Sequence, residues 1–311
     1  MNRIVMTGPT GEIGIALIQE CIKKDIEVYA ICRPCSARRS RIPEGKQVHV
    51  VECSLDTLDQ LDVSDIPVCD VFYHFGWSGT TGADRNNTHM QMENIRYTLD
   101  AVSLAHKLGC QAFVGAGSQA EYGRVEGSLT AATPAFPENG YGIAKLCAGQ
   151  MSRLECEKQG IRHVWTRILS VYGPYDGEMT MVTATIRKLL AGEKPSLTAG
   201  EQQWDYLYAG DAARAMLAVG EKGKDGRIYC IGSGQARPLK EYIKEMRDQI
   251  DPEAALGLGD VPYGERQVMY LCADISELTE DTGFVPQTDF STGIAATIEW
   301  VRSEWRQHEN N

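Results

Sequence analysis

Tyr141 and Lys145 lie four residues apart, a spacing that suits proton transfer. On a helix, residues at this spacing share one face, so the lysine ammonium could stand beside the phenol. Two opposite charges about 4 Å apart attract by roughly 4 kcal/mol at an effective dielectric of about 20. The pKa of Tyr141 would then fall from its usual value of about 10, and the phenol could exchange a proton near neutral pH. The same spacing also occurs on solvated helix faces, so the pair needs support from the rest of the chain.

A glycine-rich turn near the N-terminus supplies that support. The segment Thr7-Gly-Pro-Thr-Gly-Glu-Ile-Gly14 follows an apolar strand, Arg3–Thr7, and opens a helix. Gly8, Gly11 and Gly14 permit a tight turn and a close approach of the backbone to a pyrophosphate, whose charge the helix N-terminus meets. A dinucleotide cradle combined with a proton donor is what hydride transfer to or from a carbinol or ketone requires.

Arg33 ends the second expected strand, 19 residues after Gly14. An acidic residue at this place would accept a hydrogen bond from a ribose 2′-hydroxyl. An arginine, with Ser36, Arg38 and Arg39 close behind, is better suited to the 2′-phosphate of NADP. The alternative is a solvated basic loop. We therefore expect NADP as the cofactor, with NAD possible.

Strands and helices alternate through the first half of the chain, which predicts a doubly wound α/β fold with a parallel Rossmann sheet. The expected strands cover Arg3–Thr7, Glu27–Cys32, Gln47–Glu52, Val68–Phe75, Gln111–Ala116 and Arg162–Arg167. After Pro174 the rhythm becomes irregular, and helices are expected near 181–191, 210–220, 239–250 and 292–306. We therefore predict a dinucleotide-binding domain over residues 1–172 and about 205–232. Residues 173–204 and 233–311 would form a smaller, mainly helical lobe over the carboxyl edge of the sheet, where ligands of such folds bind.

Composition excludes several classes of protein. A net charge of −11 argues against nucleic-acid binding, and no run of about 18 apolar residues predicts a membrane span. The N-terminus enters a strand without a leader, and the ten cysteines lack the spacing of a disulfide framework, so we expect a cytoplasmic protein. Cys32 and Cys35 have no second pair at zinc-ligand spacing, so no metal site is expected.

The order of these motifs resembles the extended short-chain dehydrogenase/reductase superfamily, and within it the NAD(P)-dependent epimerase/dehydratase family that acts on nucleotide sugars. The resemblance covers nearly the whole chain. Besides the glycine turn and the Tyr141 helix, the matching segments are Tyr73-His-Phe-Gly-Trp77, Asn94, Ser118-Gln-Ala-Glu-Tyr-Gly123, Arg167-Ile-Leu-Ser-Val-Tyr-Gly-Pro174 and Asp205-Tyr-Leu-Tyr-Ala-Gly-Asp211.

The resemblance implies roles for individual residues. Tyr141 would exchange the proton of a sugar hydroxyl or ketone, Ser118 would hydrogen-bond the same oxygen, and Lys145 would hold the nicotinamide ribose and tune Tyr141. The other implied cofactor-binding residues are Gly8, Thr10, Gly11, Glu12, Ile13, Arg33, Phe75, Gly76, Trp77 and Asn94. The implied substrate-binding residues are Ser118, Gln119, Ser170, Trp204 and Arg266.

The residues after Ser118 bear on the reaction. Relatives that eliminate water carry an Asp or Ser and then a Glu there, whereas this chain has Gln119 and Ala120. Glu121, at strand period, should face the other way. Relatives that epimerise C3 and C5 place a cysteine nearby and use a separate histidine. The resemblance thus favours redox at one carbinol, expected to be C4, by a 4-keto-sugar reductase rather than a 4-epimerase, because NADP is expected. A reductase of a non-sugar ketone or acyl thioester, a 4,6-dehydratase and a silent dinucleotide sensor are the alternatives.

Three positions concern the substrate. The family often has Asn where Ser170 stands and Arg where Trp204 stands, and both usually touch the nucleotide diphosphate. Trp204 could instead stack on a base or sugar, or pack within the lobe. Arg266 resembles the C-terminal arginine that clamps phosphate. The helices at 90–108 and 141–158 resemble those that pair across a two-fold axis, so a homodimer is expected.

Overall fold

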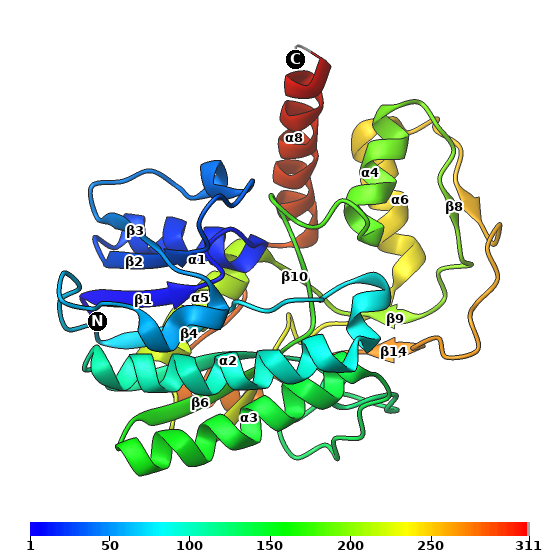
Figure 1. The fold of residues 1–311 in the computed structure, drawn as a ribbon. Coiled ribbons are helices and arrows are strands. Elements are labelled where there is room, and N and C mark those ends of the chain that lie inside the picture. The colour runs from blue at the N-terminus through cyan, green and yellow to red at the C-terminus, as the bar shows by residue number, and fades with distance from the viewer. Residues whose placement is uncertain (310–311) are drawn as a thin grey trace.

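The computed structural model describes residues 1–309 and is built around a seven-stranded parallel sheet (Figure 1). The strand order is β11-β6-β5-β4-β1-β2-β3, and every neighbouring pair is parallel. The strands are β1 Arg3–Thr7, β2 Glu27–Cys32, β3 Val48–Glu52, β4 Val71–His74, β5 Ala112–Ser118, β6 Arg162–Ile168 and β11 Arg227–Ile231. The predicted doubly wound α/β fold is confirmed.

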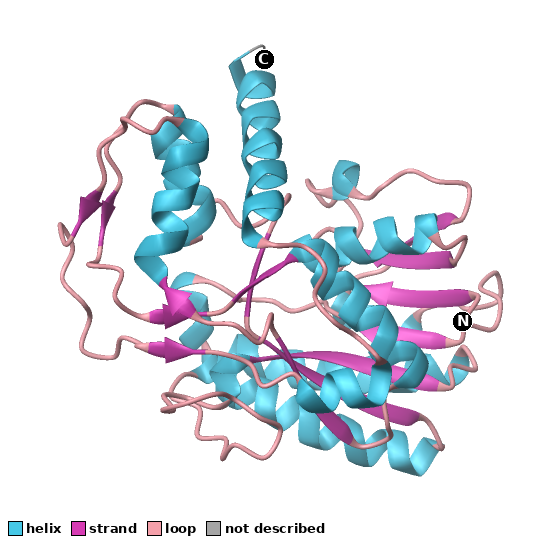
Figure 2. Ribbon diagram, turned by 180° about the vertical axis from the view of Figure 1, so that it is seen from behind, coloured by secondary structure: helices cyan, strands magenta, loops and turns pink. Residues whose placement is uncertain are grey.

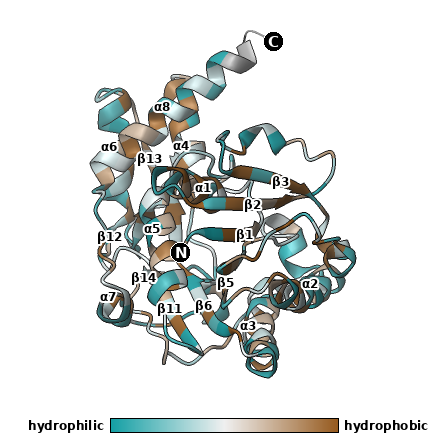
Figure 3. Ribbon diagram, turned by 90° about the vertical axis from the view of Figure 1, so that its left-hand side faces the viewer, coloured by the Kyte–Doolittle hydropathy of each residue, from teal (hydrophilic) through white to brown (hydrophobic). Residues whose placement is uncertain are grey.

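Helices cover both faces of the sheet, as Figure 3 shows. One face carries α1 Glu12–Lys23, α5 Ala209–Lys222 and the short α7 Ser276–Thr282, and the other carries α2 Thr88–Lys107 and α3 Gly140–Gln159. The central strands are therefore buried on both faces and read as unbroken apolar runs, as in Ile4-Val5-Met6 of β1.

The remaining helices form a separate apolar cluster beyond the carboxyl edge of the sheet (Figures 1 and 2). They are α4 Met181–Leu190, α6 Leu239–Ile250 and α8 Phe290–Glu309. Short strands link this cluster to the sheet: β7 Ser170–Tyr172 pairs with β10 Tyr206–Tyr208, β9 Gln203–Trp204 lies between β12 Arg237–Pro238 and β14 Tyr270–Leu271, and β8 Ser196–Leu197 pairs with β13 Gly257–Leu258. The short 3-10 segments are η1 Arg39–Arg41, η2 Leu55–Gln60, η3 Gly82–Asn86 and η4 Gln119–Glu121.

The structure corrects details of the expected elements, and the strand predicted over Val68–Phe75 is shortened to Val71–His74. β11 was not predicted, because its five residues lie between Gly226 and Gly232 and alternate too briefly to mark a strand. Ser118 is the last residue of β5, two residues beyond the predicted end of that strand. Within residues 1–309, no helix combines the length and apolar character that crossing a membrane would need.

Candidate active site

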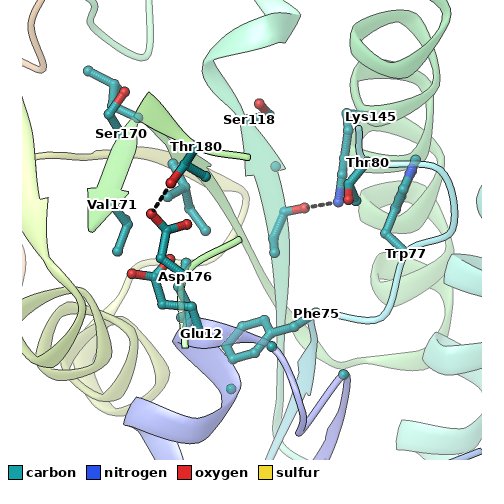
Figure 4. Close-up of a pocket in the computed structure, with 18 of the residues that line it drawn as sticks. Glu12, Phe75, Trp77, Thr80, Ser118, Lys145, Ser170, Val171, Asp176 and Thr180 are labelled. Atoms are coloured by element: carbon teal, nitrogen blue, oxygen red, sulfur yellow. Dashed lines mark hydrogen bonds between the residues drawn. The ribbon is translucent and has the colours of Figure 1, made fainter. Parts of the chain in front are cut away.

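A cavity of about 620 Å³ lies where the carboxyl ends of the central strands meet the helical lobe (Figure 4). The glycine turn forms one wall, and Ser118, Tyr141 and Lys145 form another. Residues of the lobe close the third side, namely Ser170, Asp176, Thr180, Val182 and Trp204. The fold therefore brings the expected cofactor cradle, the expected catalytic residues and the expected substrate lobe to one space.

The glycine turn has the geometry of a cradle for a pyrophosphate. Gly8 has a φ of 71°, and a Cβ there would lie 2.8 Å from the backbone nitrogen of Gly76. A Cβ on Gly14 would lie 2.3 Å from the carbonyl oxygen of Gly8. Gly11 precedes α1 and provides no side-chain cap, so the first N–H groups of the helix are free to meet an anion. The turn fits a bound dinucleotide for these reasons.

A second cavity of about 680 Å³ continues from the turn along β2. Thr10 and Gly76 line it, together with the expected basic segment Arg33, Ser36 and Arg38. Arg39 does not line it and pairs instead with Glu52. Trp77 lines both cavities, so the two spaces adjoin around its side chain.

Tyr141 lies half-buried in the first turn of α3, next to Ser118 at the end of β5. The pKa of Tyr141 is raised above its usual value, mainly because the phenol is removed from water and also because of the charge of Glu121. A hydrogen bond with Ser118 and the positive charge of Arg85 lower this pKa, but they do not outweigh the rise. The expectation that Lys145 lowers the pKa of Tyr141 is therefore wrong for the protein without ligands.

Lys145 has other partners. Its Nζ donates a 2.6 Å hydrogen bond to the carbonyl oxygen of Ala116 and lies 3.7 Å from the ring centroid of Trp77, but 5.7 Å from that of Tyr141 (Figure 4). Burial lowers the pKa of Lys145 to about 7, against the opposing charge of Glu121. Lys145 is thus held on the cavity wall with an ammonium group that loses its proton more readily than that of an exposed lysine.

Glu121 does face away from the cavity, but not for the expected reason. Residues 119–121 form the 3-10 segment η4 rather than a continued strand. The Glu121 carboxylate accepts hydrogen bonds from Trp165 Nε1 at 3.0 Å, Arg167 Nε at 2.7 Å and the Ser118 backbone nitrogen at 2.8 Å. It is fully buried and fixes the end of β5 that carries Ser118.

Three of the expected site residues line neither of these two cavities. The amide of Asn94 is buried and bonds the backbone nitrogen and oxygen of Ser78, each at 2.9 Å, so it ties α2 to the loop after β4. Gln119 and Arg266 line a different cavity of about 250 Å³, which they share with Arg85, Arg124 and Glu138. Arg266 lies between β13 and β14 and does not line the large cavity, so the expected phosphate clamp does not face the space between cofactor turn and lobe.

Ser170 and Trp204, the two departures from the family pattern, contact each other. The indole Nε1 of Trp204 donates a 2.8 Å hydrogen bond to Ser170 Oγ, and both side chains line the large cavity. The two residues that differ from the family pattern are therefore hydrogen-bonded to each other on the lobe side of the large cavity.

A pair of carboxyl groups on the cavity wall was not predicted as such. Glu12 was expected to bind the cofactor and Asp176 was not singled out, yet the two side chains lie together (Figure 4). Burial and the charge of Asp176 raise the pKa of Glu12 well above its usual value, and Glu12 Oε1 has no hydrogen-bond partner. Burial raises the pKa of Asp176 to about 6, although Thr180 Oγ1 donates to it at 2.6 Å.

Among the described residues, no cluster of three His, Cys, Asp or Glu could hold a metal ion.

Fold and site together define a dinucleotide-dependent enzyme of the extended short-chain dehydrogenase/reductase superfamily. The model of the NAD dependent epimerase/dehydratase family matches residues 4–232, and the chain belongs to this family.

Proteins similar to the chain include two dTDP-glucose 4,6-dehydratases and a UDP-N-acetylglucosamine 4-epimerase. The dTDP-glucose 4,6-dehydratase of Escherichia coli is 29% identical over an alignment of 192 residues, which covers 58% of this chain and 53% of that enzyme, so the match spans about half the relative. The dTDP-D-glucose 4,6-dehydratase of Mus musculus is 26% identical over an alignment of 330 residues, gaps included, which covers 99% of this chain and 91% of that enzyme. A solved UDP-N-acetylglucosamine 4-epimerase from Methanobrevibacter ruminantium, in complex with UDP-N-acetylmuramic acid, has a TM-score of 0.87 at 20% identity and covers 97% of this chain and 99% of that one. At that identity the structural likeness shows the fold alone.

Proposed function

We propose that this chain is an NADP-dependent oxidoreductase that reduces the C4 ketone of a nucleotide sugar. The observation that carries the proposal is the single cavity in which the glycine turn, Ser118 and Tyr141 face the lobe. Bound NADPH would supply the hydride. Tyr141 is placed to give a proton to the substrate oxygen, and Ser118 is placed to hydrogen-bond the same oxygen.

The side chains near Ser118 argue against elimination of water. Such a reaction needs groups that remove and return protons at neighbouring carbons, and neither the amide of Gln119 nor the methyl of Ala120 can do so. Glu121 is the nearest carboxylate in sequence, but all its accepted hydrogen bonds come from Trp165, Arg167 and the Ser118 backbone. A 4,6-dehydratase is therefore disfavoured, although curated relatives carry that name.

The choice of NADP rests on the second cavity. Arg33 and Arg38 line it beside the glycine turn, and neither has an ion-pair partner among the described residues. Two guanidinium groups at this place suit a 2′-phosphate, whereas the neighbouring Asp56 could bind an adenosine hydroxyl instead.

The nucleotide part of the substrate would lie against the lobe. Thr180, Met181 and Val182 bring the N-terminus of α4 to the cavity wall, where helix N–H groups can meet a diphosphate. Trp204 offers a flat apolar surface for a base or sugar.

The second candidate is a 4-epimerase, an activity that belongs to the NAD dependent epimerase/dehydratase family. Mass spectrometry of ligands that co-purify with the protein, followed by a panel of nucleotide sugars and 4-keto sugars, separates the two. A reductase oxidises one NADPH for each sugar reduced, whereas a 4-epimerase interconverts two sugars without net oxidation. Turnover of only a non-sugar ketone or acyl thioester, or binding without any turnover, would overturn the nucleotide-sugar assignment.

We also propose a homodimer formed by α2 and α3. These helices pack side by side on the outside of the sheet, and apolar side chains remain exposed on them, namely Met92, Ile143, Met151 and Leu154. A second copy would cover this surface. Sedimentation as a monomer at micromolar concentration would contradict the dimer.

A further inference from the structure

The guanidinium of Arg85 lies over the ring of Tyr141, with Cζ 4.3 Å from the ring centroid. Arg85 belongs to η3 in the loop between β4 and α2, outside every motif described above. Its side chain is half-buried, and no carboxylate pairs with it within residues 1–309. An uncompensated positive charge therefore stands on one face of the expected proton donor.

Hydrogen bonds fix this charge in place. Arg85 Nη1 donates to the carbonyl oxygen of Thr80 at 2.9 Å, which braces the guanidinium against its own loop. The side chain of Asn86 accepts a 3.0 Å hydrogen bond from the backbone nitrogen of Gly140, the first residue of α3. The loop is thus tied to the turn of helix that carries Tyr141.

None of the other charged and polar neighbours of Tyr141 named here places a positive charge as close to its ring as Arg85 does. The Nζ of Lys145 is farther from the ring centroid, at 5.7 Å, and is hydrogen-bonded elsewhere. Ser118 is neutral, and the charge of Glu121 opposes ionisation of the phenol. In the protein without ligands, Arg85 is therefore the cation best placed to act on Tyr141.

We propose that Arg85 stabilises the phenolate of Tyr141 and so serves the proton-transfer step. The negative charge of a phenolate spreads into its ring, so a cation over the ring face attracts the phenolate more strongly than the neutral phenol. The catalytic consequence rests on the proposed function: as the substrate carbon accepts the hydride, the phenol O–H bond breaks and its proton goes to the substrate oxygen. The phenolate that remains faces Arg85 until solvent returns a proton.

The chain offers a matched control for this role. Arg124 lines the same small cavity as Arg85 but binds both carboxylate oxygens of Glu138, at 2.8 to 3.0 Å, and its guanidinium does not lie over the Tyr141 ring. Loss of Arg124 alters the charge of that cavity without removing the contact on the ring.

The test replaces Tyr141 by 3,5-difluorotyrosine, whose more acidic phenol titrates at a lower pH, where the fold is intact, and follows the phenol by 19F NMR. It compares the otherwise unchanged protein with R85M, R85K and R124M in the absence of substrate. We expect R85M to raise the titration midpoint by about one pH unit, R85K to raise it less, and R124M to leave it unchanged. A midpoint that R85M leaves in place, or that R124M moves equally, would overturn the proposal.

This readout is independent of turnover. If the midpoint moves as expected while Tyr141→Phe retains full reductase activity, the electrostatic role of Arg85 stands and the proposed function fails. If Tyr141→Phe abolishes activity but R85M does not move the midpoint, the proposed function stands and the role of Arg85 fails.

Discussion

Glu121 and Arg167 form an ion pair of 2.7 Å behind Ser118, and the two side chains are 0% and 3% exposed. The same carboxylate holds the backbone nitrogen of Ser118 at 2.8 Å, and the Arg167 guanidinium lies 4.3 Å from the ring centroid of Tyr122. The ion pair therefore joins β5, η4 and β6 at the end of β5 that carries Ser118, the proposed catalytic serine.

Removal of one partner of this ion pair should lower the stability of the fold substantially. E121Q leaves the Arg167 charge buried without a counter-ion, and such changes typically lower the free energy of unfolding by about 3–5 kcal/mol. Urea unfolding of E121Q measures the loss, and E138Q, which breaks the exposed pair with Arg124, provides the comparison. E138Q should change the free energy of unfolding much less, and equal effects would contradict the account of Glu121.

The buried ammonium of Lys145 should give stability a distinct pH dependence. Its pKa is lowered to about 7 in the folded protein, whereas an unfolded lysine keeps its proton up to about pH 10. Between about pH 7 and 10 the unfolded state binds more protons, so the contribution of Lys145 to stability rises with pH. Wild type should therefore gain free energy of unfolding relative to K145M from pH 7 to 9 in urea titrations of the ligand-free protein. Parallel curves for the two proteins would mean that the ammonium is not desolvated.

Glu12 should show the opposite trend. Its pKa is raised well above the usual value by burial and by Asp176, so the folded protein keeps a proton that an unfolded glutamate loses above about pH 4. The contribution of Glu12 to stability is then lost as pH rises toward the raised pKa. E12Q cannot ionise, and we expect it to melt at a higher temperature than wild type at pH 8, with the difference vanishing near pH 4. A pH-independent difference would show that the Glu12 carboxyl is not responsible.

The basic segment after β2 should decide the cofactor. R33A/R38A removes the two guanidinium groups that line the second cavity, and we expect the Kd for NADPH to rise by about 10- to 100-fold with little change for NADH. Quenching of protein fluorescence on titration with each nucleotide gives both constants. R39A is the matched control, because Arg39 pairs with Glu52 outside that cavity. Tighter binding of NADH by wild type would assign the enzyme to NAD instead.

The parts of the site that follow regular elements could be predicted from the sequence. The glycine turn comes directly between β1 and α1, and Ser118 and Tyr141 stand at the end of a strand and the start of a helix, so local spacing places them. The hydrogen-bond partner of Lys145 could not be predicted, because its flexible side chain reaches Ala116 and Trp77 rather than the neighbour one helical turn away.

The positions of residues on irregular segments could not be predicted from the spacing of motifs in the sequence. Arg85 and Asp176 lie in loops that only tertiary packing brings to Tyr141 and to Glu12. Arg266 has the expected residue type, but its loop leads it to the small cavity beside Arg124. β11 could not be predicted because it is a short segment between Gly226 and Gly232, and its position is determined by pairing with β6 rather than by the pattern of apolar residues within it.

The most direct test of the central claim follows the hydride itself. NADPH carrying deuterium at both C4 positions of the nicotinamide is incubated with the protein and the 4-keto nucleotide sugars of the panel, and the products are examined by NMR. We predict deuterium at C4 of the reduced sugar, with Tyr141→Phe slowing its appearance by at least about 100-fold. Sugars that remain unlabelled while NADPH binds, or equal labelling by Tyr141→Phe, would contradict the account.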